Sequence, residues 1–218
     1  KNIYSKLIFD KDSFPSFEWS QSFELIELDK SCVNNSTFNP NFNFSDDVKI
    51  NFEKIFLKPF NEIVRDDIFN IQKLIIDEKF KSYEGLEYLT CLQYLDAGLG
   101  FKFWGRDYRF LSNLTELRYL NCNYCSDLRA EHLYPLKKLE YLITPARFKN
   151  ISMLHKLSNL EYIDLQRSEG GCKDYDELDN LENLKEVYLG NSDLSFYLNN
   201  DYENTNDNFV FSKSPSGK

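Results

Sequence analysis

The feature that most constrains the fold of this 218-residue chain is an internal repeat of apolar residues. Within one copy, residues 86–95 (LEYLTCLQYL), an apolar residue stands at every third position. The pattern recurs as Leu111/Leu114/Leu117/Leu120, Leu133/Leu136/Leu139/Leu142, Leu154/Leu157/Leu160/Ile163 and Leu178/Leu181/Leu184/Val187, after a weaker copy at Ile68/Ile71/Leu74. From Leu74 to Val187, the last apolar positions of successive copies are 21, 25, 22, 21 and 24 residues apart. Such a period indicates stacked units, none of which can bury its apolar side alone.

The spacing changes after the last apolar position of each copy. Apolar residues there alternate with polar ones, as in Leu120-Asn121-Cys122. A change from period three to period two predicts a helical or 3₁₀ turn that runs into a short strand. Stacked copies would place these strands side by side in one parallel sheet over a shared core.

The run L-x-x-L-x-x-L-x-x-L-x-L, firm over residues 67–194, resembles the leucine-rich-repeat family and is similar to the internalin-type bacterial repeats. The resemblance implies an α/β solenoid, with a parallel sheet on its concave face and short helices or 3₁₀ turns on its convex face. The sequence departs from the family's pattern after the strand, where the usual Asn or Cys occurs only at Cys125. We therefore expect irregular turns.

The repeats divide the chain into three expected parts. Residues 1–66 form an irregular N-terminal cap, residues 67–198 the repeats, and residues 199–218 a polar, disordered tail. Alternating apolar residues at 23–25 and 48–52 predict two irregular strands that extend the sheet within the cap.

The charge balance bears on the kind of partner. The chain has 26 Lys and Arg against 35 Asp and Glu, a net charge of −9. This balance argues against a nucleic-acid partner, which requires clustered bases, and favours a basic protein. No apolar run approaches the roughly 18–20 residues of a membrane span, so we expect no membrane partner. Five cysteines, an odd number without a dense framework, predict reduced thiols and a cytoplasmic location.

No group of residues has the spacing of a catalytic or metal site. Cys122 and Cys125 form a CxxC pair, but no second pair exists, and both fall on repeat positions that favour packing in the core. The only histidines are His132 and His155. We therefore predict no catalytic residues, no metal, no cofactor and no enzymatic activity. A carboxylate-based activity on the acidic residues near the C-terminus remains the rival interpretation.

The outward side of the predicted sheet is the candidate binding surface. Because strand side chains alternate, the residues flanking the last apolar position of each copy point away from the core. Four successive copies place Tyr at the same register, with polar groups alongside. Tyr offers a large contact area and a hydroxyl group, which suits protein interfaces. The predicted partner-binding residues are Tyr94, Asp96, Tyr119, Asn121, Tyr141, Tyr162, Asp164, Glu186, Tyr188 and, from an aromatic insertion at 101–110, Trp104. The alternative is that the tyrosines only stack on one another to stabilise the sheet.

These features predict a protein-binding module without enzymatic activity. Residues 161–186 hold nine acids and three bases, which would attract a basic partner. By analogy, a small acidic repeat protein resembles a bacterial immunity protein that inhibits a basic toxin or nuclease. The alternative is a leucine-rich-repeat adaptor or effector recognition module with a hydrophobic partner.

Overall fold

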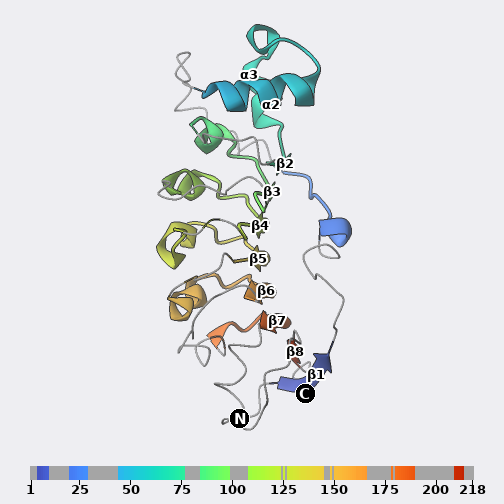
Figure 1. The fold of residues 1–218 in the computed structure, drawn as a ribbon, viewed down its shortest axis with the longest axis vertical. Helices are drawn as coiled ribbons and strands as arrows, with labels where there is room; N and C mark the ends of the chain where they lie inside the picture. The colour runs from blue at the N-terminus through green and yellow to red at the C-terminus, as the bar shows by residue number, and fades with distance from the viewer. Residues whose placement is uncertain are drawn as a thin grey trace.

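The structure is a computed structural model that describes residues 4–9, 20–28, 44–76, 84–98, 108–123, 125, 127–144, 148, 150–165, 178, 180–189 and 209–213. Its centre is a stack of parallel strands, each formed by an alternating segment of the repeat (Figure 1). The strands are β2 (Lys73–Ile75), β3 (Tyr94–Asp96), β4 (Tyr119–Asn121), β5 (Tyr141–Ile143), β6 (Tyr162–Leu165) and β7 (Glu186–Leu189). The predicted leucine-rich-repeat solenoid is confirmed.

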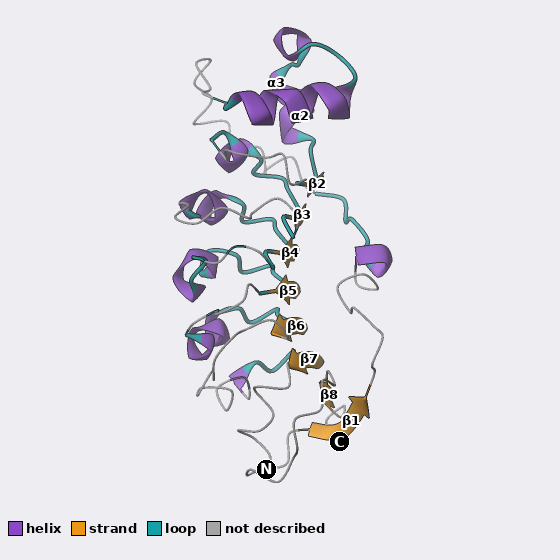
Figure 2. Cartoon of the chain, in the orientation of Figure 1, coloured by secondary structure: helices purple, strands orange, loops and turns teal. Residues whose placement is uncertain are grey.

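Short 3₁₀ helices lie on the side of the stack opposite the strands (Figure 2). They are η4 (Leu86–Tyr88), η5 (Arg109–Asn113), η6 (Ala130–Leu133) and η7 (Ile151–Lys156). The spacing of three explains them, because a 3₁₀ helix has three residues per turn and aligns every third side chain. The backbone N–H of Leu114 bonds the carbonyl of Leu111, and that of Leu117 bonds Leu114, each at 3.0 Å. All three leucines are buried in the single core that runs through the stack.

The cap beside β2 is helical rather than stranded. It contains α2 (Asp46–Phe56), η3 (Phe60–Glu62) and α3 (Arg65–Phe69). The expected strand at 48–52 was therefore wrong, and residues 23–25 form no strand either. Ser45 caps α2 by accepting a hydrogen bond from the Val48 N–H, and acidic residues occupy its first turn. Val48 and Phe52, four residues apart, then share the buried face of a helix.

Phe44 joins this cap to the first full repeat. Its ring contacts the rings of Phe52, Phe60 and Tyr88 at centroid distances of 5.3, 5.6 and 5.5 Å. Beneath it lies Gly85, whose φ of +103° favours glycine and whose missing Cβ leaves room for the Phe44 ring.

The two ends of the chain meet at the other end of the sheet (Figure 1). Strand β8 (Phe209–Lys213) pairs antiparallel with β7, and β1 (Tyr4–Phe9) pairs antiparallel with β8. The expectation of a wholly disordered tail was therefore wrong at residues 209–213, where aromatic and β-branched residues (Phe209, Val210, Phe211) suit a strand. The domain boundaries at residues 66 and 198 stay predictions.

The cysteines fall into two groups. Cys122 and Cys125 are buried free thiols, as predicted; Cys122 donates to the carbonyl of Ile143 at 3.0 Å, and burial raises the pKa of the Cys125 thiol. A raised pKa keeps that thiol protonated and unreactive. Cys91, however, is disulfide-bonded, so the expectation that all five thiols are reduced was wrong. Spacing along the chain could not reveal which cysteines the fold brings together.

Candidate functional site: the concave face

The tyrosines form the ladder that their register predicts. Tyr94, Tyr119, Tyr141 and Tyr162 occupy equivalent positions on β3 to β6, and Glu186 continues the column on β7. The ladder consists of two stacked pairs. Tyr94 and Tyr119 lie 4.2 Å apart with a 9° angle between ring planes, and Tyr141 and Tyr162 lie 4.5 Å apart at 4°. The two pairs are separated by 6.0 Å and 35°, so the ladder is broken between Tyr119 and Tyr141.

A lysine ammonium lies over the ring at each end of this ladder. The Lys73 ammonium lies 4.3 Å from the centre of the Tyr94 ring, and the Lys185 ammonium lies 5.6 Å from that of Tyr162. Ring stacking and cation–π contacts of this kind contribute to stability within the sheet. Self-stacking, the alternative role for these tyrosines, is therefore part of what they do.

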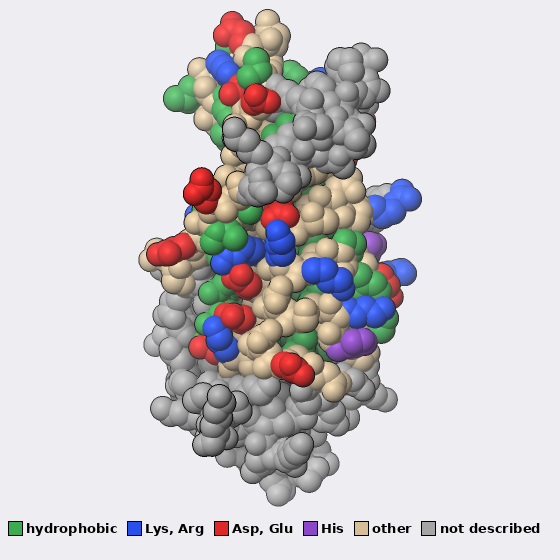
Figure 3. All heavy atoms as spheres, turned by 180° about the vertical axis from the view of Figure 1, so that it is seen from behind, with side chains coloured by type: hydrophobic (Ala, Val, Ile, Leu, Met, Phe, Trp, Pro, Cys, Tyr) green, Lys and Arg blue, Asp and Glu red, His purple; other side chains and the backbone are tan. Residues whose placement is uncertain are grey.

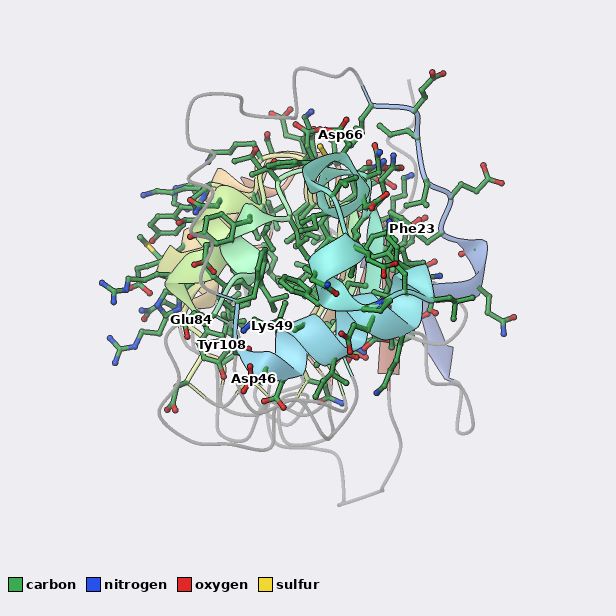
Figure 4. All side chains as sticks on the ribbon, turned by 90° about the horizontal axis from the view of Figure 1, so that it is seen from above. Phe23, Asp46, Lys49, Asp66, Glu84 and Tyr108 are labelled. Carbon is green, nitrogen blue, oxygen red and sulfur yellow. The ribbon has the colours of Figure 1, made fainter. Side chains whose placement is uncertain are left out.

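The chain's own N-terminal strap, which we define as residues 20–28, crosses the concave face. Figure 1 shows it beside the strands, on the side away from the 3₁₀ helices. The Phe23 ring contacts Tyr94, Tyr119 and Tyr141 at centroid distances of 5.4, 5.7 and 5.9 Å. In the view along the stack, Phe23 and Tyr108 lie on opposite sides of the core (Figure 4).

The strap changes which tyrosines a partner can reach. Tyr94 and Tyr119 are completely buried, whereas Tyr141 and Tyr162 are only half-buried. Burial raises the pKa of Tyr119, and it also raises that of Tyr94, whose hydroxyl donates to Ser20 Oγ at 3.0 Å. Of the predicted ladder, the Tyr141–Tyr162 pair is thus the part that remains accessible.

Two polar side chains, each at the residue before a strand, hold the strap, and neither was among the predicted binding residues. Gln93 accepts the N–H of Ile26 at 3.0 Å and donates to its carbonyl at 2.6 Å. Arg118 donates to the carbonyl of Glu24 at 2.9 Å, and its guanidinium lies 5.0 Å from the Phe23 ring. The repeat register could have identified them, because the residue before each strand is polar in every copy. This row of residues is Gln72, Gln93, Arg118, Glu140, Glu161 and Lys185.

Ion pairs fix most of this row in place. Both side-chain nitrogens of Arg118 that face Glu140 donate to its carboxylate at 2.8 Å, a two-point pairing that orients the guanidinium. Glu161 and Lys185 pair at 2.6 Å. Four of the charged groups that border the tyrosines are thus paired with one another.

Two of the predicted residues at the third position of a strand, Asp96 and Asn121, bond the loop that follows the strand as well as lying on the concave side. Asp96 accepts the N–H of Gly98 at 2.9 Å, and Asn121 accepts that of Asn123 at 3.2 Å. Both side chains cap the turn that follows their strand, and burial raises the pKa of Asp96. Asp164 and Tyr188 are buried. Trp104 lies outside the described residues.

The predicted acidic segment lies partly outside the described residues. Of its nine acids between 161 and 186, Glu161, Asp164, Glu182 and Glu186 are among the described residues. Figure 3 shows basic and acidic side chains intermixed over the face of the stack that is seen from behind. The convex side carries several exposed bases. From η5 to η7 and their turns, it exposes Arg109, Arg129, Lys137, Lys138, His155 and Lys156.

The Tyr141 hydroxyl gives a test of this geometry. Burial, assisted by Tyr162 and Glu161, raises its pKa from 10.0 to about 12. The neutral phenol is therefore favoured in the folded state, and this stability is complete below pH ~10 and lost as the pH rises through about 12. Urea unfolding at about pH 9 and about pH 11 should show a larger loss of stability for the wild type than for Tyr141→Phe. Equal losses would contradict the burial of this hydroxyl.

Two kinds of site do not occur within the described part of the chain. No group of three or more His, Cys, Asp or Glu side chains there could hold a metal ion. Nor is any helix there both long and apolar enough to cross a membrane.

The sequence matches no protein-family model and no curated protein. Among solved structures, an internalin (InlF) from Listeria monocytogenes aligns with 70% of this chain at 20% identity and a TM-score of 0.39. The alignment covers 58% of that internalin, little more than half its length. Internalin C2 from the same organism aligns with 64% of this chain and 71% of its own, at 19% identity and a TM-score of 0.48. At these identities the likeness concerns the fold alone.

Proposed function

We propose that this chain is a protein-binding module that holds its partner against the concave face, at the half-buried Tyr141–Tyr162 pair. The observation that carries the proposal is this pair: two parallel rings, 4.5 Å apart, on a sheet that fixes their positions. Rigid tyrosines lose little conformational entropy when a partner covers them, which makes them effective interface anchors.

The partner that fits best is basic. Glu186 continues the tyrosine column, and the chain as a whole carries a charge of −9. Five of the described exposed bases, Arg109, Arg129, Lys137, Lys138 and Lys156, lie on the convex side, whereas Lys73, Arg118 and Lys185 lie on the concave side. Because Arg118 and Lys185 pair with Glu140 and Glu161, the Glu186 carboxylate adds negative charge at the end of the column, which raises the rate of association with a cationic surface.

A capture experiment tests the charge of the partner. Three immobilised proteins are exposed to native cell extract at low and at high salt. They are the wild type, Glu186→Gln on the concave face, and Glu131→Gln on the convex helix η6. Both variants remove one negative charge. We expect the wild type and Glu131→Gln to retain a basic protein at low salt, and Glu186→Gln or high salt to release it. If the captured protein is retained equally at both salt concentrations and by Glu186→Gln, the alternative is favoured, an adaptor for a hydrophobic partner.

The finer proposal is that the module is an inhibitor, of the immunity-protein kind, for a basic toxin or nuclease. It follows from the acidic charge and the absence of a recognised catalytic motif in the sequence. The captured protein should then have a measurable activity that an equimolar amount of this chain abolishes. A captured protein whose activity is unchanged by the complex would contradict inhibition and leave a binding role.

Location and enzymatic activity both stay predictions. A cytoplasmic location follows from the sequence, but the disulfide at Cys91 favours an oxidising compartment. Labelling of free thiols in protein taken directly from cells would distinguish a cytoplasmic location from an oxidising compartment, because a cytoplasmic chain should have Cys91 reduced.

A further inference from the structure

The strap is bound to the concave face in the manner of a peptide ligand. Of its side chains, Phe23 packs on the tyrosine ladder and Ser20 accepts a hydrogen bond from Tyr94, while Leu25 and Ile26 remain 46% and 47% exposed. Its backbone, at Glu24 and Ile26, makes hydrogen bonds to side chains of the repeats. One aromatic side chain, the Ser20 hydroxyl and the backbone of Glu24 and Ile26 thus account for most of the recognition.

The groups that receive the strap are also held by hydrogen bonds within the repeats. Glu140 holds Arg118 from the next repeat, and the Gln93 amide also donates to Gln72 Oε1 at 3.0 Å. Gln93 is completely buried, and its amide bonds both the N–H and the carbonyl of Ile26. A buried amide of this kind binds an extended backbone as a neighbouring strand would, through one donor and one acceptor.

We infer that Tyr94, Tyr119 and Tyr141, with Gln93 and Arg118, form a binding site for an extended peptide carrying one aromatic anchor, and that the strap is its resident occupant. The partner supplies an extended segment with a Phe-like side chain, an acceptor one residue later for Arg118, and a free backbone N–H and C=O three residues later for Gln93. To bind, it must displace the strap. This inference rests on the proposed function and names the chemistry of the partner at the same face.

The spacing is taken from the strap itself. Phe23 occupies the aromatic position, Glu24 provides the carbonyl that Arg118 binds, and Ile26 provides the N–H and C=O that Gln93 binds. Since the strap belongs to the same chain, its local concentration is high, and a free peptide has to compete against it. Weakening the strap must therefore strengthen binding of a peptide added in trans.

The test uses a fluorescent synthetic peptide with the sequence of residues 20–28, added to the full chain. We expect it to bind Phe23→Ala at least tenfold more tightly than the wild type, because the resident anchor is gone. The same peptide with Ala in place of Phe should bind neither protein. Adding Arg118→Ala to Phe23→Ala should weaken binding again, and circular dichroism would confirm that each variant is folded. Equal affinity for wild type and Phe23→Ala, or equal binding of the Ala peptide, would overturn the inference.

Two further measurements separate displacement of the strap by a partner from self-association and from binding that leaves the strap in place. A wild-type dimer in light scattering that Phe23→Ala abolishes would assign the site to a second copy and contradict a separate partner.

Capture from native extract separates the inference from the proposed function. If Tyr162→Ala abolishes capture but Phe23→Ala leaves it unchanged, the concave face binds its partner without displacing the strap, and only this inference fails. If the peptide binds as expected but Tyr162→Ala captures as much protein as the wild type does, the proposed function fails instead.

Discussion

Replacing Gly85 with Ala should destabilise the N-terminal cap by about 3 kcal/mol, the largest stability effect we expect from a single methyl group in this chain. Two causes act together. The backbone at Gly85 has a φ of +103°, which side-chain-bearing residues rarely adopt, and a Cβ there would overlap the Phe44 ring. Phe44 cannot move aside easily, since three other rings surround it. Hydrogen exchange of the α2 amides measures the effect locally.

Gly98→Ala is the matched control for this prediction. A Cβ at Gly98 would also come close to a neighbour, but that neighbour is the Asn121 side chain, and φ at Gly98 is not in the left-handed region. Moving the Asn121 side chain aside gives up its hydrogen bond to the Asn123 N–H but requires no strained backbone, so the loss should be less than half that of Gly85→Ala. Combining Gly85→Ala with Phe44→Ala should cost less than the sum of the two single changes, because the overlap disappears. Additive losses would contradict the packing of Phe44 on Gly85.

Replacing Tyr141 and Tyr162 together with Ala should weaken partner binding by at least about 2 kcal/mol, roughly thirtyfold in Kd. The pair is the accessible part of the ladder, and its rings are fixed by the sheet and by each other. The fold should survive, because both rings are only half-buried and the leucine core beneath the sheet does not include them. Titration of the partner captured from native extract into the purified variant measures the change in Kd.

The convex face offers a matched control for the tyrosine pair. Tyr134 is half-buried like Tyr162, and it also has a lysine over its ring, since the Lys156 ammonium lies 4.1 Å from the ring centre. Tyr134→Ala removes the same kind of side chain from the opposite side of the stack. It should leave the Kd unchanged. Equal weakening by the two changes would indicate a general loss of stability rather than a lost contact.

The repeat spacing predicted the solenoid, its strands and the register of the tyrosines because all of these depend on local periodicity. A residue at every third position specifies 3₁₀ turns, and alternation after it specifies a strand whose neighbours follow from the period. The same reasoning failed at residues 48–52. An alternating pattern of only five residues also fits a helix. The Ser45 cap and the acidic first turn favour a helix there, and the segment forms α2.

The strap could not be predicted from the sequence. Its bonds join residues far apart in the chain: Ile26 and Gln93 are 67 residues apart, Ser20 and Tyr94 are 74, and Glu24 and Arg118 are 94. The strap also carries no copy of the repeat, so nothing in its own pattern indicates the ladder as its binding site. The candidate site therefore had the correct register but included two tyrosines, Tyr94 and Tyr119, that the chain itself covers.

Hydroxyl-radical footprinting with the captured partner tests the central claim most directly, because it compares two tyrosines in one sample. Tyr162 lies on the concave face and Tyr134 on the convex face, and both are half-buried. If the concave face binds the partner, adding it should slow the oxidation of Tyr162 severalfold and leave the rate at Tyr134 unchanged. Protection of Tyr134 with no change at Tyr162 would contradict the concave face as the binding surface.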